Sequence, residues 1–252
     1  MKLALVTGGF HRIGAVIAAR LAEGGWSLAL HSRKPTEPDT ALAAALALHR
    51  TIWKPFVADL SDGSAVIPLL PAIISEFGRA PDLIVNNASL FEWDDTASVT
   101  PESLAKHMAV NLSAPVLLAT SLAQYVQGEA RAAVVNILDQ RIRQPNSDQL
   151  SYTLSKQALA GATETLARSL APQIRVNAVA PGLTLPTDDY RPAQMKALES
   201  AMPLSILPEP GDIADAVLWL ATAKATSGQT IFVDGGASMR SFDRDFMFLD
   251  ES

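Results

Sequence analysis

The stretch Leu3-Ala-Leu-Val-Thr-Gly-Gly-Phe-His-Arg-Ile-Gly14 joins a short apolar run to a helical pattern near residues 13–24. Glycines let the backbone turn tightly here, and the free N–H groups and positive dipole end of a following helix attract a pyrophosphate. Gly8 and Gly14 are separated by five residues, and Arg12 stands where a middle glycine is common. The stretch therefore predicts the first strand, glycine turn and helix of a nucleotide-binding α/β sheet.

Outward from this turn, apolar runs alternate with helix-length segments along the 252 residues of the chain. The predicted strands are Leu3–Thr7, Ser27–His31, Thr51–Val57, Leu83–Asn86, Ala132–Leu138, Arg175–Ala178 and Thr230–Val233. The predicted helices lie near residues 13–24, 39–50, 63–77, 101–127, 150–171 and 212–223. Continuous apolar strands indicate burial on both faces, and strand–helix repetition indicates right-handed parallel crossovers. We therefore predict a doubly wound parallel α/β sheet with helices on both faces, in a single domain over residues 1–240.

The composition limits the classes of function. Hydrophobic residues make up 48% and charged residues 18%, which is typical of a globular protein. The formal charge of −6 argues against a nucleic-acid partner, and the lack of cysteine excludes disulfides and thiolate chemistry. The first apolar run is too short for a signal segment or a membrane span, so we expect a cytoplasmic protein without a membrane partner. No metal site is predicted, because the spacing of the histidines does not suit metal ligands; they are His11, His31, His49 and His107.

The segment after the second strand indicates the cofactor. Dinucleotide folds that prefer NAD place an acidic residue there to bind the ribose 2′-hydroxyl. This chain has Leu30-His-Ser-Arg-Lys34 with no acid, so Ser32, Arg33 and Arg12 are candidates to bind an added 2′-phosphate. The sequence therefore favours NADPH over NADH. Asp59, after the third strand, is either a contact for the adenine edge or a cap of the next helix.

A second group of residues predicts proton transfer. Tyr152 and Lys156 lie four residues apart, and Asp139 lies thirteen residues before the tyrosine. Positions i and i+4 share a helix face, so both side chains can reach one substrate atom. A free phenol has a pKa near 10, and a neighbouring lysine cation lowers it. The same spacing also fits a tyrosine and a lysine on a solvated helix face, so the position of the pair after a nucleotide-binding half decides the interpretation.

These motifs occur together in one order along the chain. They are Thr7–Gly14, Asn86-Asn-Ala-Ser89, Asn111, Tyr152–Lys156, the Pro181-Gly182 turn and Asp234-Gly-Gly236. The set resembles the short-chain dehydrogenase/reductase family, over nearly the whole chain. The resemblance implies a seven-stranded Rossmann-type domain, commonly a homotetramer, that transfers hydride between a nicotinamide and a substrate.

The resemblance also implies roles for single residues. Tyr152 would donate the proton, and Lys156 would bind the nicotinamide ribose and lower the phenol pKa. Asn111 would hold a water in a proton relay, and Asn87 would help to hold the cofactor. These residues, with Asp139, form the predicted catalytic and cofactor-holding centre.

Asp139 departs from the family pattern, which has an active-site serine at this position. A serine hydroxyl donates to a carbonyl oxygen that becomes an alkoxide, whereas an ionised carboxylate repels that charge. Ordinary ketone reduction is therefore disfavoured unless Asp139 is protonated. A carboxyl group instead suits a substrate with ring N–H donors, or one whose nitrogen takes a proton during C=N reduction, such as a pterin.

Further motifs agree with that substrate class. They are Arg12, the His-x-Arg pattern of His31 and Arg33, Asn87-Ala-Ser-Leu-Phe91, Asp139 before the tyrosine motif, and Pro181-Gly-Leu-Thr184. They resemble pteridine reductases and the related bacterial dihydromonapterin and dihydrofolate reductases. In that subgroup the phenylalanine stacks on the pterin, which implies this role for Phe91, while Ser89 and Arg12 would contact cofactor phosphates or the pterin.

The predicted site residues fall into two further sets. The cofactor set is Gly8, Arg12, Ile13, Gly14, His31, Ser32, Arg33, Asp59, Leu60, Asn87, Ala88, Ser89, Lys156, Pro181, Gly182 and Thr184. The substrate set is Ser89, Phe91, Asp139, Tyr152 and Arg12. Phe91 is alternatively a loop aromatic packed on the core, and Asp139 alternatively a turn cap.

Two segments have no clear periodicity. Residues 183–210 are predicted to form the substrate loop, because long loops in compact domains are often lids or binding loops. The tail, residues 241–252, is either a frayed terminus or a segment that docks on a neighbouring subunit.

The sequence thus favours an NADPH-dependent reductase that acts on a dihydropterin- or dihydrofolate-like ring. One alternative is an NADPH-dependent carbonyl reductase for a ketone or a sugar, with Asp139 held neutral. The other is a non-catalytic NADP(H)-sensing protein, which has no need of the proton-transfer residues Tyr152, Lys156 and Asn111.

Overall fold

The structure is a computed structural model that describes residues 2–185 and 190–249. Within these residues a parallel sheet has seven strands in the order β3-β2-β1-β4-β5-β6-β7. The strands are β1 Leu3–Thr7, β2 Ser27–Ser32, β3 Trp53–Val57, β4 Leu83–Asn86, β5 Ala132–Ile137, β6 Ile174–Pro181 and β7 Thr230–Val233. The predicted seven-stranded, doubly wound parallel sheet is confirmed.

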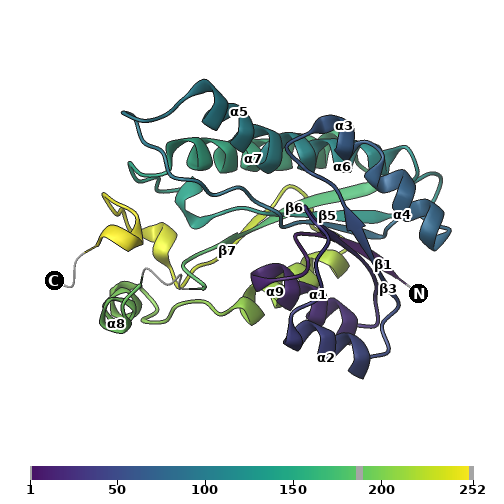
Figure 1. Ribbon diagram of the computed structural model, residues 1–252, viewed down its shortest axis with the longest axis horizontal. Helices are drawn as coiled ribbons and strands as arrows, with labels where there is room; N and C mark the ends of the chain where they lie inside the picture. Colours follow the sequence, from purple (N-terminus) through teal and green to yellow (C-terminus); the bar gives the residue numbers. More distant parts are fainter. Residues whose placement is uncertain (1, 186–189, 250–252) are drawn as a thin grey trace.

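Helices cover both faces of the sheet (Figure 1). They are α1 Arg12–Glu23, α2 Thr40–Leu48, α3 Gly63–Val66, α4 Leu69–Phe77, α5 Pro101–Met108, α6 Ala114–Ala123, α7 Leu150–Ser169, α8 Pro192–Ala201 and α9 Pro210–Thr222. Helices α1, α2 and α9 share one apolar core on one face, and α3, α4, α6 and α7 share a second core on the other. Among the described residues, no helix is both long enough and apolar enough to cross a membrane.

Burial of the strands explains their sequences. Strands β1, β4 and β5 are buried along their full length, in agreement with their continuous apolar runs. The edge strands β3 and β7 are partly exposed. Pro55 lies in β3, and a proline without an N–H donor is tolerated on an edge strand.

Two of the predicted helices are interrupted. The segment 63–77 divides into α3 and α4 at Pro68, which cannot donate a helical hydrogen bond. The segment 101–127 contains a π-helical turn, Ala109–Ser113, between α5 and α6. Single π turns occur frequently at functional sites, and this one contains Asn111.

Helix α8 lies within residues 183–210, although the sequence showed no core element there. Its Leu198 is buried in a cluster with Met202, Ala237 and Phe246. Residues 186–189 of the predicted substrate loop lie outside the described residues. The tail is not frayed over residues 241–249, since Asp245 and Phe246 are buried and a 3₁₀ turn spans Phe246–Phe248. It lies beside α8 (Figure 1), and the last residues of the predicted tail, 250–252, lie outside the description.

The carboxyl ends of the strands bring the predicted site residues to one edge of the sheet. Gly8 follows β1, Asn87 follows β4 and Asp139 follows β5. The strand order reverses at the β1–β4 pair, because β2 and β3 extend to one side and β5 to β7 to the other. Open α/β sheets bind ligands in the crevice at such a switch point.

Candidate active site

A cavity of about 790 Å³ opens at this edge. The predicted residues that line it are Gly8, Arg12, Ile13, Gly14, His31, Arg33, Asp59, Leu60, Asn87, Ala88, Ser89, Phe91, Asp139, Tyr152, Lys156, Pro181 and Gly182. Thr184 lines an adjoining cavity of about 220 Å³, which also shares Arg12, Phe91 and Asp139. Ser32 and Asn111 line neither of these two cavities. Ser32 Oγ donates instead to the main-chain oxygen of Lys34 at 2.8 Å.

The glycine turn is held against the loop after β4. Gly8 has a φ of +62°, which favours glycine. A Cβ on Gly14 would lie 2.0 Å from the main-chain oxygen of Gly8, so only glycine fits. The side-chain Nδ2 of Asn87 donates to the oxygens of Thr7 and Gly8, at 2.9 and 3.1 Å. These contacts leave a compact backbone cradle at the N-terminus of α1, as a pyrophosphate requires.

Arg12 begins α1 with a φ of +55°, a left-handed conformation that is unusual for a residue other than glycine. Its side chain is exposed and lines both cavities. No acidic side chain lies in the first turn of α1. A strained cation at the positive end of a helix dipole is unfavourable in isolation, and this favours a role for Arg12 in binding an anion.

His31 is hydrogen-bonded to the glycine turn. Its ring is buried; Nδ1 accepts from the N–H of Gly8 at 3.3 Å, and Nε2 donates to the oxygen of Ala58 at 3.0 Å. Burial lowers the pKa of this imidazole, so it is neutral at pH 7. Arg33 is the exposed cation after β2 that lines the larger cavity.

Asp59 lines the cavity, and its side chain also accepts hydrogen bonds within a local turn. Its Oδ1 accepts from the hydroxyl and N–H of Ser61, at 2.7 and 2.9 Å, and these bonds lower its pKa. The neighbouring Asp62, not Asp59, is the N-cap of α3, where it accepts from the N–H of Ser64.

The proposed proton-transfer residues meet at the start of α7. The phenol of Tyr152 donates to Oδ2 of Asp139 at 3.0 Å, and Phe91 packs edge-on against the phenol ring with 4.7 Å between centroids. The buried Nζ of Lys156 donates to the oxygen of Ile137 at 2.8 Å and lies 5.6 Å from the phenol ring. Phe91 is half-exposed and lines the cavity, and the guanidinium carbon of Arg141 lies 5.7 Å from the centroid of its ring.

The electrostatics of this group differ from the expectation that the lysine lowers the phenol pKa. Burial and the carboxylate of Asp139 raise the pKa of Tyr152 well above its usual value. Burial lowers the pKa of Lys156 to about 8. Tyr152 therefore carries its phenol proton at pH 7, while the pKa of Lys156 lies only slightly above neutral pH.

The side chain of Asn111 is fully used within the protein. Its Oδ1 accepts from the N–H of Leu90 at 2.7 Å and from Ser89 Oγ at 3.2 Å. Its Nδ2 donates to the oxygen of Leu90 and to Ser155 Oγ, both at 2.9 Å. Asn111 thus fixes the loop before Phe91 to α7, and a water held by this residue would have to bond to its main chain.

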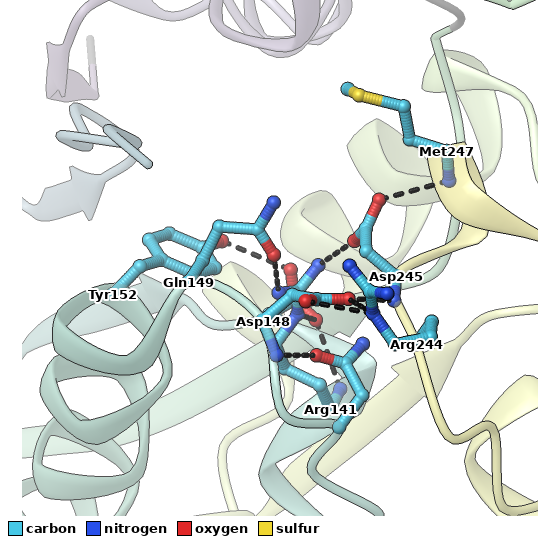
Figure 2. Close-up of polar contacts among 9 residues, drawn as sticks. Arg141, Asp148, Gln149, Tyr152, Arg244, Asp245 and Met247 are labelled. Carbon is cyan, nitrogen blue, oxygen red and sulfur yellow. Dashed lines mark hydrogen bonds and ion pairs between the residues drawn. The ribbon is translucent and has the colours of Figure 1, made fainter. Parts of the chain in front are cut away.

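Sequence reasoning missed the cation that holds Asp139. Arg141 is buried, and its N–H and Nε donate to Asp139 Oδ1 at 2.9 and 3.2 Å. Its Nη1 donates to Gln149 Oε1 at 2.9 Å, and its Nη2 to Asp245 Oδ2 at 2.6 Å (Figure 2). The Asp-x-Arg spacing after the fifth strand was the available local signal for Arg141. Asp245 lies in a tail that mixes aromatics and charges without a clear period, and no local pattern marks it as a site residue.

The fold and this arrangement define a nucleotide-dependent oxidoreductase. A family model described as enoyl-(acyl carrier protein) reductase matches residues 9–238. The chain belongs to the short-chain dehydrogenase/reductase family.

Relatives within the family extend this result. FolM alternative dihydrofolate reductase 1 from Brucella canis, solved in complex with NADP, is 36% identical with a TM-score of 0.87 and 95% coverage of both chains. Dihydromonapterin reductase of Enterobacter sp. (strain 638) is 28% identical over 237 residues, 92% of this chain and 95% of that protein. Granaticin polyketide synthase putative ketoacyl reductase 2 of Streptomyces violaceoruber is 31% identical over 247 residues, 94% and 96% respectively. The first two support the predicted pteridine-reductase-like subgroup, although a ketoacyl reductase is equally similar in sequence.

Proposed function

We propose that the protein is an NADPH-dependent reductase of a pterin-type ring, with a dihydropterin or a dihydrofolate-like molecule as substrate. The observation that carries the proposal is the 3.0 Å hydrogen bond from Tyr152 to Asp139 beside the half-exposed ring of Phe91. A planar heterocycle with N–H donors suits this combination of an aromatic platform, a carboxylate acceptor and a phenol donor.

The residues present fit a dinucleotide. The cradle of Gly8 and Gly14 excludes a side chain where the backbone must approach the pyrophosphate. Arg12 and Arg33 are exposed cations at the cavity, and the segment from Leu30 to Lys34 at the end of β2 contains no acid to favour a 2′-hydroxyl. The FolM relatives from Brucella canis and Brucella suis were both solved with NADP. When bound, NADPH would supply the hydride.

The chain's own residues would manage the proton. Tyr152 holds a phenol proton at pH 7 because of its raised pKa, and it can release that proton to a ring nitrogen. Asp139 can accept a hydrogen bond from a ring N–H and thereby favour the protonated form of that ring nitrogen. Lys156, held by the oxygen of Ile137, would supply a cation 5.6 Å from the centroid of the phenol ring and would hold the nicotinamide ribose. Phe91 would stack on one ring face and exclude water.

A carbonyl reductase of the same family is the second candidate. It is supported by the sequence similarity to a ketoacyl reductase. In that case Asp139 would need to donate to a ketone oxygen, whereas its two oxygens accept hydrogen bonds from Arg141 and from the phenol of Tyr152. A non-catalytic NADP(H) sensor gives no reason for the Tyr152–Asp139 bond. As the family resemblance implies, the enzyme would be a homotetramer, and its globular composition fits a place in the cytoplasm.

Turnover measurements test the proposal. Purified protein is assayed for NADPH oxidation with a 7,8-dihydropterin, with dihydrofolate and with a panel of ketones and sugars. We expect turnover of the heterocycles, and a loss of this turnover with a gain in ketone reduction for Asp139→Ser. Ketone turnover without any reaction of the heterocycles would reject the pterin proposal. NADPH binding without turnover on any of them would favour the sensor.

A further inference from the structure

The C-terminal tail of the same chain reaches the proposed proton-transfer residues. It lies against α8, where Gln194 Nε2 donates to the main-chain oxygens of Phe246 and Met247, both at 3.1 Å. Phe246 is buried beside Leu198, and Phe248 packs edge-on against Trp93 with 5.1 Å between centroids. Residues 245–247 thereby form one wall of the 220 Å³ cavity that adjoins the larger one.

A continuous chain of charged groups links this tail to the phenol (Figure 2). Asp245 Oδ2 accepts from Arg141 Nη2 at 2.6 Å, and both side chains are 6% exposed. Arg141 donates from its backbone N–H and from Nε to the near oxygen of Asp139. The other oxygen of Asp139 accepts from the phenol of Tyr152. Each carboxylate of this chain therefore has a fixed orientation.

Asp245 is itself locked in place by its neighbours. Its Oδ1 accepts from the N–H of Met247 at 3.0 Å, and its own N–H donates to Asp148 Oδ2 at 2.7 Å. Asp148 is buried and is paired with Arg244 at 2.9 Å. The guanidinium of Arg141 is consequently held by a carboxylate that cannot easily move.

We propose that Asp245 is a positioning residue for the reaction: through Arg141 it fixes Asp139 as the acceptor that faces Tyr152. The proposal rests on the proposed function only in taking Tyr152 and Asp139 as the proton-transfer pair. It makes the tail of each chain a component of that chain's own active site.

Anchoring of the tail alone does not account for Asp245. The main-chain bonds from Gln194, the buried ring of Phe246 and the Arg244–Asp148 pair already hold the tail. Taking a carboxylate and a guanidinium out of water is costly, and an apolar pair of similar size is often as stable. The specific result of using charged groups here is that Arg141 is held between two carboxylates and cannot turn away from Asp139.

The test compares two variants that each remove one negative charge from the tail. Asp245→Asn removes the carboxylate at Arg141. Asp243→Asn is the matched control, because the side chain of Asp243 is exposed and lies two residues away on the same segment. We expect Asp245→Asn to lower kcat about tenfold, as a misplaced catalytic group does, with unchanged NADPH affinity and an unchanged far-ultraviolet circular dichroism spectrum. Asp243→Asn should match the wild type.

A double-mutant cycle separates positioning from general damage. If Asp245 acts through Asp139, then Asp245→Asn should have little further effect on kcat in an Asp139→Asn background. An equal loss in both backgrounds, or a wild-type kcat for Asp245→Asn, would overturn the proposal.

A pH titration gives an independent readout if Asp139→Asn is too slow to measure. The charged groups around the phenol are Asp139, Arg141, Asp245 and Lys156, and Asp245 helps to raise the phenol pKa. Loss of the Asp245 carboxylate should therefore let the phenol of Tyr152 ionise at lower pH, which an ultraviolet titration of phenolate absorbance measures in the wild type and in Asp245→Asn. An unchanged phenolate titration would contradict the proposal. The kinetic assays use the dihydropterin, or the best ketone if the wild type reduces only ketones. Failure of the pterin proposal is therefore seen in the wild-type protein, whereas failure of the Asp245 proposal is seen only in the variants.

Discussion

At the residue scale, Lys156 has the most informative environment. It is buried, and within the described part of the chain its Nζ donates one hydrogen bond, to a main-chain oxygen that carries no full charge. Burial lowers its pKa from 10.5 to about 8. A residue that we propose acts as a cation in catalysis thus lies where its charge is unfavourable for the fold, which is a common conflict at active sites.

Lys156→Met should stabilise the protein while it abolishes turnover. Below pH 8 the lysine is protonated in both the folded and the unfolded chain, so wild type bears the full burial cost there. Between pH 8 and 10.5 the unfolded chain binds more protons, so wild-type stability from this group rises with pH. We expect Lys156→Met to raise the free energy of unfolding by about 1–2 kcal/mol at pH 7, after allowing for the lost hydrogen bond. The gain should shrink as the pH rises from 8 to 10.5.

Urea denaturation at several pH values measures this effect. Lys196→Met, at an exposed position on α8, is the control and should change stability by less than about 0.5 kcal/mol at every pH. A Lys156→Met variant that is less stable than wild type at pH 7 would show that the hydrogen bond to Ile137 outweighs the burial of the charge.

Residues that act through local spacing could be predicted from the sequence, and residues that act through tertiary contact could not. Tyr152 and Lys156 share a helix face because they are four residues apart, and the spacing alone shows it. Arg141 and Asp245 are 104 residues apart and meet only after the tail has folded onto α8. The raised pKa of Tyr152 likewise depends on burial, which the spacing does not reveal.

At the element scale, α7 presents Tyr152 near its beginning and is held there by a distant side chain. The residue before the helix, Gln149, has a φ of +46° and makes no side-chain cap. Asp94 replaces the cap: its Oδ1 accepts from the N–H of Ser151 at 2.9 Å, and its Oδ2 from Ser103 Oγ at 2.7 Å. Burial acts to raise the pKa of Asp94, but hydrogen bonding to Ser151 and Ser103 outweighs it, so the pKa is lowered.

Asp94→Ala should therefore destabilise the fold and disturb the site together. Loss of an N-terminal cap costs about 1–2 kcal/mol. Because Tyr152 follows Ser151 directly, kcat should fall more than KM changes. Asp95→Ala is the neighbouring control, since Asp95 is partly exposed and its Oδ1 accepts from Ala97 and Ser98 in its own local turn. Urea denaturation and steady-state kinetics check both variants, and equal effects at the two positions would argue against a special role for Asp94.

Elements with a simple apolar pattern were predictable, and elements that depend on their surroundings were not. The buried strands β1, β4 and β5 read directly as apolar runs. Helix α8 was not recognised, because its buried Leu198 gains its apolar environment from the tail and from residues after β7. The π-helical turn Ala109–Ser113 has no propensity signature, since it arises from the packing between α5, α6 and α7.

At the scale of the whole molecule, one half of the sheet carries the proposed cofactor-binding residues and the other half carries the proposed substrate and proton-transfer residues. The β1–β2–β3 side carries the glycine turn, Arg12 and Arg33, and the β4–β5–β6 side carries Phe91, Asp139 and Tyr152. Both halves line the same 790 Å³ cavity. A ligand that spans this cavity contacts both halves and must therefore stabilise the whole fold, not one lobe of it.

NADPH should raise the melting temperature of the protein more than NADH does. A ligand at about 100 times its Kd stabilises the folded state by about 2.7 kcal/mol, which is roughly 5–10 °C for a chain of this length. NADH lacks the 2′-phosphate that Arg33 and Arg12 are proposed to bind, so the same concentration should give a much smaller shift. Thermal denaturation with each nucleotide measures the difference, and Arg33→Ala should reduce the NADPH shift toward the NADH value. Lys34→Ala, the adjacent exposed cation, is the matched control. Equal shifts for the two nucleotides in the wild-type protein would mean that the exposed arginines do not select the phosphate, and the cofactor assignment would then rest on the FolM relatives alone.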